Sequence, residues 1–293
     1  MASSFNPADV AGSEAYYSLS LTPSQQALLS RLTPFRFRPA PSSTGSSASL
    51  VEPFLPLRSP SDLPLILTPP RPSDIPRQVE CLNHPAVAFC LVGPPYPYAA
   101  EHAREWGATK GRDLEEYFFR LLEKLEAQGK AVEQLPTVPY EDGWRYRPDG
   151  CPCNSIRRAD TGEWVGDLGT FRWVFEDVQD PEERERLAKE NLARVAGDEE
   201  LRWSFGFFLH PSYGGRGLMT GLLASHVSYL RGFLRTKHIH GAAFSDNIPS
   251  LRTQEKNGFV RYAAWTRQIS EARGGGTKEV AVLKWQAGDG AEQ

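Results

Sequence analysis

Residues 210–223, HPSYGGRGLMTGLL, form a glycine-rich turn between a predicted strand and a predicted helix. The apolar run 205–209 before the turn has the length of a strand. Apolar residues after it recur at helical spacing: Leu222, Leu223, Val227 and Leu230. The three glycines at 214, 215 and 217 allow positive φ angles and a close backbone approach, and the first turn of a helix has unpaired N–H groups. The stretch therefore predicts an anion site, most naturally for a phosphate or pyrophosphate.

The turn differs in sequence from two well-known phosphate-binding loops, and these differences limit the kind of phosphate ligand that it is expected to bind. A Walker loop ends in Gly-Lys-Ser/Thr, and this turn has no lysine. A dinucleotide-binding loop reads GxGxxG, whereas Gly215 and Gly217 are followed at the third place by Thr220, without a convincing acidic partner after the next strand. A nucleotide-dependent enzyme using this turn is one alternative, which binding of a nicotinamide dinucleotide would favour.

A second motif lies about one strand further along the chain. Residues 238–244 are a predicted strand, and Asn247-Ile-Pro-Ser250 after it starts a predicted helix. Proline at the start of that helix and Gly258 just past its end agree with helix boundaries. The helix then runs into the next predicted strand through Lys256-Asn-Gly-Phe259.

Together the two motifs resemble the GNAT acetyltransferase superfamily, whose acetyl-CoA loop Arg/Gln-x-x-Gly-x-Gly/Ala falls on Gly214, Gly217 and Met219. The resemblance implies an α/β (α+β) fold with a mixed, mostly antiparallel central sheet that splays between its fourth and fifth strands and is flanked by helices. It also implies acetyl-CoA as co-substrate, without a metal. The cofactor-binding residues that it implies are Phe208, Leu209, Gly214, Gly215, Arg216, Gly217, Leu218, Met219, Thr220, Asn247 and Ser250.

The region before the turn is similar to the Rim-type branch of this superfamily, which acetylates protein N-terminal amines. A predicted strand at 63–68, a helix at 75–83 capped by Asp74, a Pro-Tyr loop at 93–98 and a helix at 99–106 follow one another. A predicted hairpin, 154–173, contains Val-Gly-Asp-Leu-Gly at 165–169, which resembles the third strand of this type. The resemblance implies that Tyr96, Tyr98 and Asp167 contact the acceptor, and that residues near Arg273 flank its entrance.

The predicted reaction is direct attack of a neutral amine on the thioester carbonyl. The backbone N–H near Leu209 would stabilise the oxyanion, and Asp246 and His210 are the candidates for proton transfer. Many family members carry a tyrosine where this chain has Gln254, and some carry a glutamate where it has Ala242. Without a strong base, an α-amine or other weakly basic acceptor is favoured over lysine, whose pKa is about 2.5 units higher.

Composition divides the chain into three predicted parts. Twelve of the 24 prolines lie within residues 1–72, and this bias predicts a largely disordered tail, 1–62. Thr22-Pro23-Ser24-Gln25 within it has capping-box form and predicts a short helix, either packed on the domain or used as a docking peptide. The acetyltransferase domain is predicted at 63–286 and a disordered C-terminus at 287–293. The domain includes an amphipathic helix, 113–128, followed by a proline-bearing link, 135–148.

An insert rich in acidic residues, 176–200, interrupts the predicted domain. We expect a helix that starts after Asp180 and ends near Gly197, either as a solvated surface helix with i,i+4 ion pairs or as an acidic lip that concentrates a cationic amine.

The remaining expectations concern partners and compartment. The net charge of −3 argues against general nucleic-acid binding, and no apolar run is long enough to span a bilayer. Four cysteines without paired spacing predict reduced thiols in a cytoplasmic or nuclear protein, with no metal site. The expected partner is an amine, either a protein N-terminus or a small amine, and the chain is a monomer or homodimer. A CoA-binding adaptor without catalytic activity is the alternative function.

Overall fold

The computed structural model describes residues 15–41, 50–127 and 147–286. Within these ranges nine strands form one sheet in the order β1-β2-β3-β4-β5-β6-β7-β9-β8. Every neighbouring pair is antiparallel except β6 and β7, which are parallel. The strands are β1 (Arg36–Pro39), β2 (Val51–Pro56), β3 (Leu65–Thr68), β4 (Ser155–Arg158), β5 (Trp164–Arg172), β6 (Arg202–Leu209), β7 (His238–Phe244), β8 (Phe259–Gln268) and β9 (Thr277–Trp285). This mixed, mostly antiparallel α/β architecture confirms the predicted fold class, and the pairing of β4 with β5 confirms the predicted hairpin.

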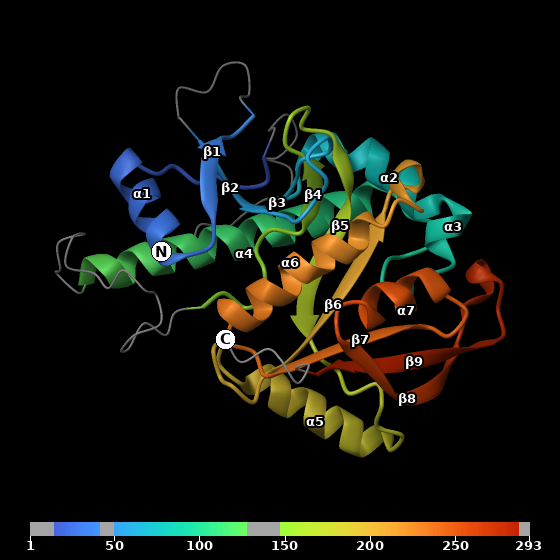
Figure 1. The fold of residues 1–293 in the computed structure, drawn as a ribbon. Helices are drawn as coiled ribbons and strands as arrows, with labels where there is room; N and C mark the ends of the chain where they lie inside the picture. Colours follow the sequence, from blue (N-terminus) through green and yellow to red (C-terminus); the bar gives the residue numbers. More distant parts are fainter. Residues whose placement is uncertain (1–14, 42–49, 128–146, 287–293) are drawn as a thin grey trace.

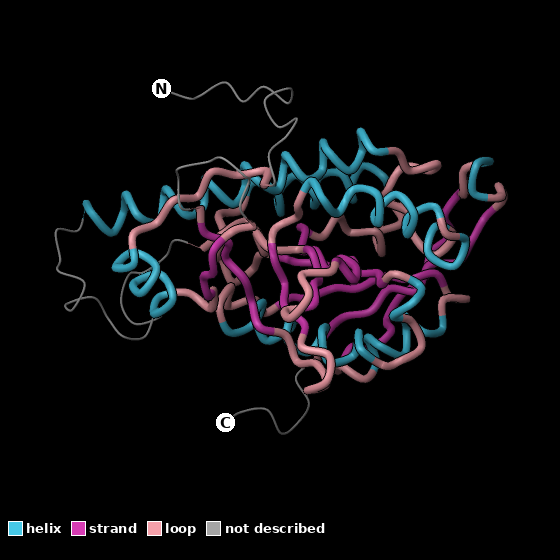
Figure 2. The backbone as a smooth tube through the Cα atoms, turned by 90° about the horizontal axis from the view of Figure 1, so that it is seen from above, coloured by secondary structure: helices cyan, strands magenta, loops and turns pink. Residues whose placement is uncertain are grey.

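Helices lie on both sides of the strands (Figures 1 and 2). On one face of the central strands, α6 packs through His226, whose Nε2 lies 2.8 Å from the hydroxyl of Thr170 on β5. On the other face, α2 and the first half of α4 pack through Cys81, Tyr98 and Ala103 against Trp164 and Phe208. The helices are α1 (Pro23–Leu32), α2 (Ile75–Asn83), α3 (Pro85–Ala88), α4 (Ala100–Ala127), α5 (Pro181–Ala193), α6 (Leu218–Gly232) and α7 (Ile248–Glu255).

The segment before residue 63 is part of the fold. The predicted tail is wrong for residues 15–41 and 50–62, which contribute α1, β1 and β2 (Figure 1). Several of their apolar side chains are fully buried in the main core, Leu19, Leu29 and Phe35 among them. The predicted capping box is confirmed, because the Thr22 hydroxyl accepts from the amide of Gln25 and the Gln25 side chain accepts from the amide of Thr22. Residues 1–14, 42–49 and 287–293, and most of the predicted link 135–148, lie outside the described residues.

The two predicted helices at 99–106 and 113–128 are one continuous helix, α4. Two glycines within it, Gly107 and Gly111, face the N-terminal segment. A Cβ added at Gly107 would lie 2.2 Å from the ring of Tyr16, and one at Gly111 would lie 2.1 Å from the Tyr16 carbonyl oxygen. The glycines therefore let the backbone near Tyr16 approach the helix closely, which offsets their poor helix propensity.

Gly111→Ala is expected to lower the free energy of unfolding by about 1–3 kcal/mol, because its methyl group would overlap the Tyr16 carbonyl and force the two segments apart. Thermal or urea denaturation measures the loss. Gly232→Ala in α6 is the control, since a Cβ there meets no atom within 4 Å. That variant should be neutral or more stable by up to about 1 kcal/mol. Equal stability of the two variants would contradict the close packing of Tyr16 on α4.

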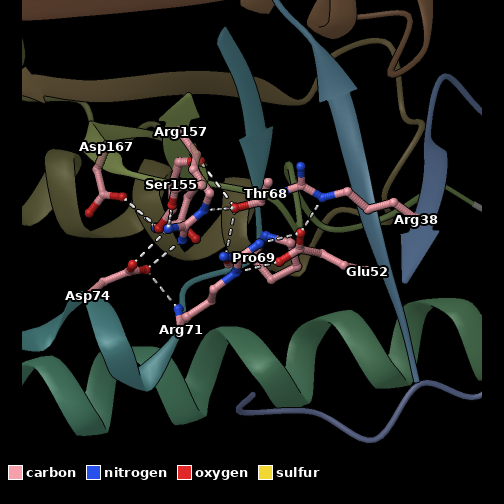
Figure 3. A network of polar contacts seen from close by, with 11 residues as sticks. Arg38, Glu52, Thr68, Pro69, Arg71, Asp74, Ser155, Arg157 and Asp167 are labelled. Carbon is pink, nitrogen blue, oxygen red and sulfur yellow. Dashed lines mark hydrogen bonds and ion pairs between the residues drawn. The ribbon is translucent and has the colours of Figure 1, made fainter. Parts of the chain in front are cut away.

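A buried network of charged groups links β2, the segment before α2, and β4 (Figure 3). Glu52, fully buried, accepts from the guanidinium groups of Arg71 and Arg38. The carboxylate of Asp74 accepts two hydrogen bonds from Arg157 at 2.8 and 2.7 Å. Asp74 was expected to cap α2, but its side chain makes no cap hydrogen bond to that helix and binds Arg157 instead.

Candidate functional site

The glycine-rich turn leaves β6 and enters α6 through a short 3-10 turn, Pro211–Tyr213. Gly215 and Gly217 adopt φ angles of 72° and 70°, and Gly217 is the N-cap of α6. A Cβ at either position would meet no atom within 4 Å, so both face open space. The amides of Leu218 and Met219 lie in the first helical turn, where no intrahelical acceptor is available. The turn therefore presents main-chain donors at the positive end of a helix, which suits an anion.

The side chains around the turn leave this surface free. Leu218 and Met219 are buried in the main core, so the bulk of Met219 points away from the exposed turn. Arg216 is exposed. The carbonyl of Thr220 accepts from the side-chain amide of Asn257 at 3.2 Å, which ties the start of α6 to the end of α7. The sequence analysis missed this role of Asn257, which lies one residue before the motif glycine.

β6 and β7 separate before β6 ends. They correspond to the fourth and fifth strands of the sheet implied by the resemblance, where this separation was predicted. Their pairing covers Arg202–His238, Trp203–Ile239 and Ser204–His240 only. On its other side β6 stays paired with β5 up to Leu209. The opening between the two strands therefore begins beyond Ser204 and leads towards the glycine-rich turn.

The backbone of β6 alternates between its two neighbours. His210 donates to the carbonyl of Val165, and Trp173 donates to the carbonyl of Arg202, so even-numbered residues of β6 bond to β5. Phe207 and Leu209 consequently direct their N–H groups towards the opening, and the carbonyl of Leu209 accepts from the thiol of Cys81 on α2 at 3.8 Å. Phe208, predicted to bind the cofactor, pairs with Asp167 and turns its backbone to β5. Its ring packs on Trp164, and its contact with the cofactor stays a prediction.

The start of α7 borders the opening from the β7 side. Asn247 caps the helix by accepting from the amide of Ser250 at 3.3 Å. The Ser250 hydroxyl accepts from the side chain of Gln254, which is buried. A Cβ added at Gly241 on β7 would lie 2.0 Å from the Gln254 oxygen, so this glycine makes room for the glutamine. Gln254 thus packs between α7 and β7.

On the opposite face of the sheet, the carboxylate of Asp167 lies where β5 is next to the end of β6. It accepts from the hydroxyl of Ser155 at 3.1 Å and from the side-chain amide of Asn154 at 3.4 Å. Burial raises the pKa of Asp167 to about 8, and the negative charge of Asp74 adds to this shift. Gly169, two residues along the same face, is open, because a Cβ there would meet no atom within 4 Å.

The loop before α4 meets the hairpin tip between β8 and β9, as expected for Tyr96 and Arg273. The Arg273 guanidinium donates to the carbonyls of Leu91 and Pro94 and lies 5.6 Å from the centre of the Tyr96 ring. Tyr98 is buried instead, and its backbone exchanges two hydrogen bonds of 2.8 Å with the side chain of Asn83. Tyr96 therefore faces this junction, whereas Tyr98 packs inside it, in the cluster that contains Cys81.

The two side chains predicted to transfer protons lie near the ends of β6 and β7. His210 is buried, its Nδ1 lies 2.7 Å from the hydroxyl of Ser212, and its Nε2 lies 3.6 Å from the carboxylate of Glu80. Asp246 is exposed and forms an ion pair of 2.9 Å with Lys278. His210 thus caps the turn after β6, and Asp246 is engaged with a cation on β9.

The acidic insert forms the predicted helix, α5, with Asp180 accepting from the amide of Glu182 at its start. The expected i,i+4 ion pairs along it are confirmed, including Lys189–Glu185 and Arg186–Glu190, although the helix ends at Ala193, before Gly197. Leu187 and Ala188 of the helix pack against a buried cluster of Trp173, Phe175 and Val282. The acidic-lip alternative stays a prediction.

Two features sought in the described residues are not found there: a group of three or more side chains with metal-binding potential, and a helix long and apolar enough to cross a membrane.

The chain was compared with known sequences, structures and protein families. No curated protein sequence is significantly similar to the chain. Among solved structures, an acetyltransferase (GNAT family) from Bacillus anthracis is 12% identical, with a TM-score of 0.47, covering 79% of this chain and 96% of its own. The apo form of RimL, a ribosomal L7/L12 alpha-N-protein acetyltransferase, is 12% identical, with a TM-score of 0.48 and coverages of 85% and 100%.

A third structure, AAC(6')-Ib in complex with ribostamycin and coenzyme A, is 15% identical, with a TM-score of 0.41 and coverages of 76% and 92%. The family model described as "Acetyltransferase (GNAT) domain" matches residues 64–260, which is more than half of the chain and includes the glycine-rich turn, the opening and α7. The chain therefore belongs to the GNAT acetyltransferases, a family of acyltransferases.

Proposed function

We propose that this protein transfers the acetyl group of acetyl-CoA to an α-amino group or another weakly basic amine, in the manner of the Rim-type branch. The observation that carries the proposal is the opening between β6 and β7, which begins beyond Ser204 and leads to the exposed turn at Gly215 and Gly217. A phosphate group fits the turn because its main-chain amides face open space at a helix N-terminus. A pantetheine chain fits the opening because β6 offers it unpaired backbone groups.

Different residues along the turn and the opening would bind different parts of acetyl-CoA. The amides of residues 215–219 would hold the pyrophosphate, and each charge-assisted hydrogen bond contributes about 1.5–3 kcal/mol. The N–H and C=O groups of Phe207 would bond to the pantetheine amides. The N–H of Leu209 would donate to the thioester oxygen as it becomes an oxyanion, and removal of one such donor typically costs about 2.7–4 kcal/mol.

The acceptor would enter on the face that carries Asp167, where Gly169 leaves the surface of β5 open. Tyr96 and Arg273 meet at the rim of this face and would restrict the shape of the acceptor. At pH 7.4 an α-amine with a pKa near 7.7–8.0 is partly neutral, whereas a lysine side chain with a pKa near 10.4 is almost fully protonated. This difference is equivalent to about 3.4 kcal/mol of deprotonation and favours the α-amine.

We expect purified protein to acetylate peptide N-termini faster than the lysine side chains of matched peptides with blocked N-termini at pH 7.4. Thioester consumption and mass spectrometry of the peptides measure the two rates, with small polyamines and arylamines as further acceptors. Faster lysine acetylation would contradict the acceptor preference. Tight CoA binding with no acetyl transfer to any amine would instead support a CoA-binding adaptor.

A further inference from the structure

The carboxylate of Asp167 has no cationic partner among the described residues, although it lies beside a buried ion network. Its hydrogen bonds come from neutral donors, Ser155 and Asn154 among them. The nearest guanidinium group in Figure 3 belongs to Arg157, which is held by two hydrogen bonds to Asp74. An ion pair with arginine would keep the carboxylate permanently ionised, and this arrangement avoids one.

The groups that face Asp167 from the neighbouring elements carry little compensating charge. Burial raises the pKa of Cys81 on α2 to about 12, and the Asp167 carboxylate adds to that shift. The pKa of Tyr98, before α4, is raised further by burial and also by Asp167. Both groups are therefore neutral at ordinary pH. Arg157 and Asp74 form a pair of opposite charge, so Asp167 is the residue in this group that is placed to change charge near neutrality.

Asp167 is also placed close to the reacting atoms. It is directly opposite Phe208, the residue before Leu209, and opposed residues on antiparallel strands lie about 5 Å apart. Its side chain projects to the face of the sheet where Gly169 and Gly206 carry no side chains. An acceptor amine on this face would lie between two groups. The N–H of Leu209 would be on the side of the opening, and the carboxylate of Asp167 would be on the other side.

We propose that Asp167 is the general base of the acetyl transfer. The acceptor nitrogen forms the new C–N bond to the thioester carbonyl carbon, one of its protons passes to the Asp167 carboxylate, and the C–S bond breaks to release the CoA thiolate. The proton then leaves Asp167 for the thiolate or solvent. This role rests on the proposed function, and it goes beyond the acceptor contact expected from the sequence.

The pKa of about 8 suits this task, because a base whose pKa lies near the working pH is both ionised enough and basic enough to accept a proton. Asp167 accepts a proton only when ionised. The rate with an arylamine, which stays neutral over the whole pH range, should therefore rise with pH and level off above about 8.

Asp167→Asn tests the role with little change in shape. With an arylamine acceptor at pH 8, kcat is expected to fall about 100-fold or more, the rise with pH should disappear, and CoA affinity by calorimetry should stay within twofold. Ser155→Ala removes a hydrogen bond that lowers the pKa of Asp167, so the rise should move to higher pH while the plateau rate is largely retained. Asp160→Asn, at an exposed turn, controls for the loss of one carboxylate and should keep the wild-type profile.

A readout independent of turnover separates this inference from the proposed function. Carbon-13 NMR titration of aspartate side chains, with Asp167→Asn for assignment, should show one carboxyl group that titrates near pH 8 in the free protein. Titration of Asp167 in the ordinary aspartate range, or a pH profile that Asp167→Asn leaves unchanged, would overturn the general-base role. Wild-type protein that acetylates no amine, with the NMR result as expected, would overturn the proposed function instead.

Discussion

Replacement of Gly217 with aspartate is expected to weaken CoA binding by about 100-fold or more while the protein stays folded. A carboxylate at this position would stand at the N-terminus of α6, where the pyrophosphate is proposed to bind, and would repel it. Loss of two charge-assisted hydrogen bonds alone accounts for about 3 kcal/mol or more, and each 1.4 kcal/mol is tenfold in affinity. Isothermal titration calorimetry with CoA, at low and high salt, measures the change.

The same substitution has a modest effect on stability. Gly217 has a φ of 70°, which costs a residue with a side chain about 1–2 kcal/mol, but its Cβ would meet no atom within 4 Å. Aspartate is also a favourable N-cap residue, which offsets part of that cost. Gly162→Asp is the matched control, because its φ of 75° imposes the same backbone strain at a hairpin turn. Equal CoA affinity of Gly217→Asp and the control would exclude the turn as the pyrophosphate site.

The parts of the fold that the sequence predicted well are those specified by local signals. The turn at Gly217, the capping box at Thr22 and the strand 238–244 depend on residues close together in the chain. The continuity of α4 depends instead on Tyr16, about 90 residues away, which occupies the space that its glycines leave. No pattern within the helix reveals such a contact.

The N-terminal strands were missed because their prolines indicated a tail. Pro39 lies at the end of β1, and Pro53 and Pro56 lie in β2, so the prolines occur in the first two strands at one edge of the sheet. Proline has no N–H to donate and is tolerated mainly at sheet edges. The proline-rich composition of this segment therefore resembles that of a disordered segment. The pairing of β1 with β2 and of β2 with β3 nevertheless fixes these residues in place.

The backbone elements of the candidate site could be predicted from the sequence, but the protonation state of its side chains could not. The order of strand, turn and helix placed the amides of the turn, and strand alternation then assigns Leu209 to the opening and Phe208 to β5. The environment of Asp167 could not be derived from sequence, since it depends on β4, α2 and the segment before α4, which are distant in the chain. That environment determines whether the carboxylate is ionised at neutral pH.

Asp74→Asn is expected to lower the free energy of unfolding by about 3–5 kcal/mol, the second large effect. The substitution leaves the Arg157 guanidinium, which is 1% exposed, without its compensating charge in the protein interior. Urea denaturation at pH 7 measures the loss. Asp160→Asn is the matched control, because Asp160 also makes two hydrogen bonds to an arginine, Arg158, but at an exposed turn. An exposed pair typically contributes about 0–1 kcal/mol.

The double variant Asp74→Asn with Arg157→Met separates the cost of an unpaired buried charge from the value of the pair itself. Removal of both charges leaves no ion to solvate, and replacement of a buried pair by apolar groups is often close to neutral. The double variant should therefore be more stable than Asp74→Asn alone, although the Thr68 hydroxyl and the Gly162 carbonyl lose their contacts with Arg157. If Asp74→Asn cost no more than Asp160→Asn, water would have to reach Arg157, and the buried network beside Asp167 could not exclude water from that carboxylate.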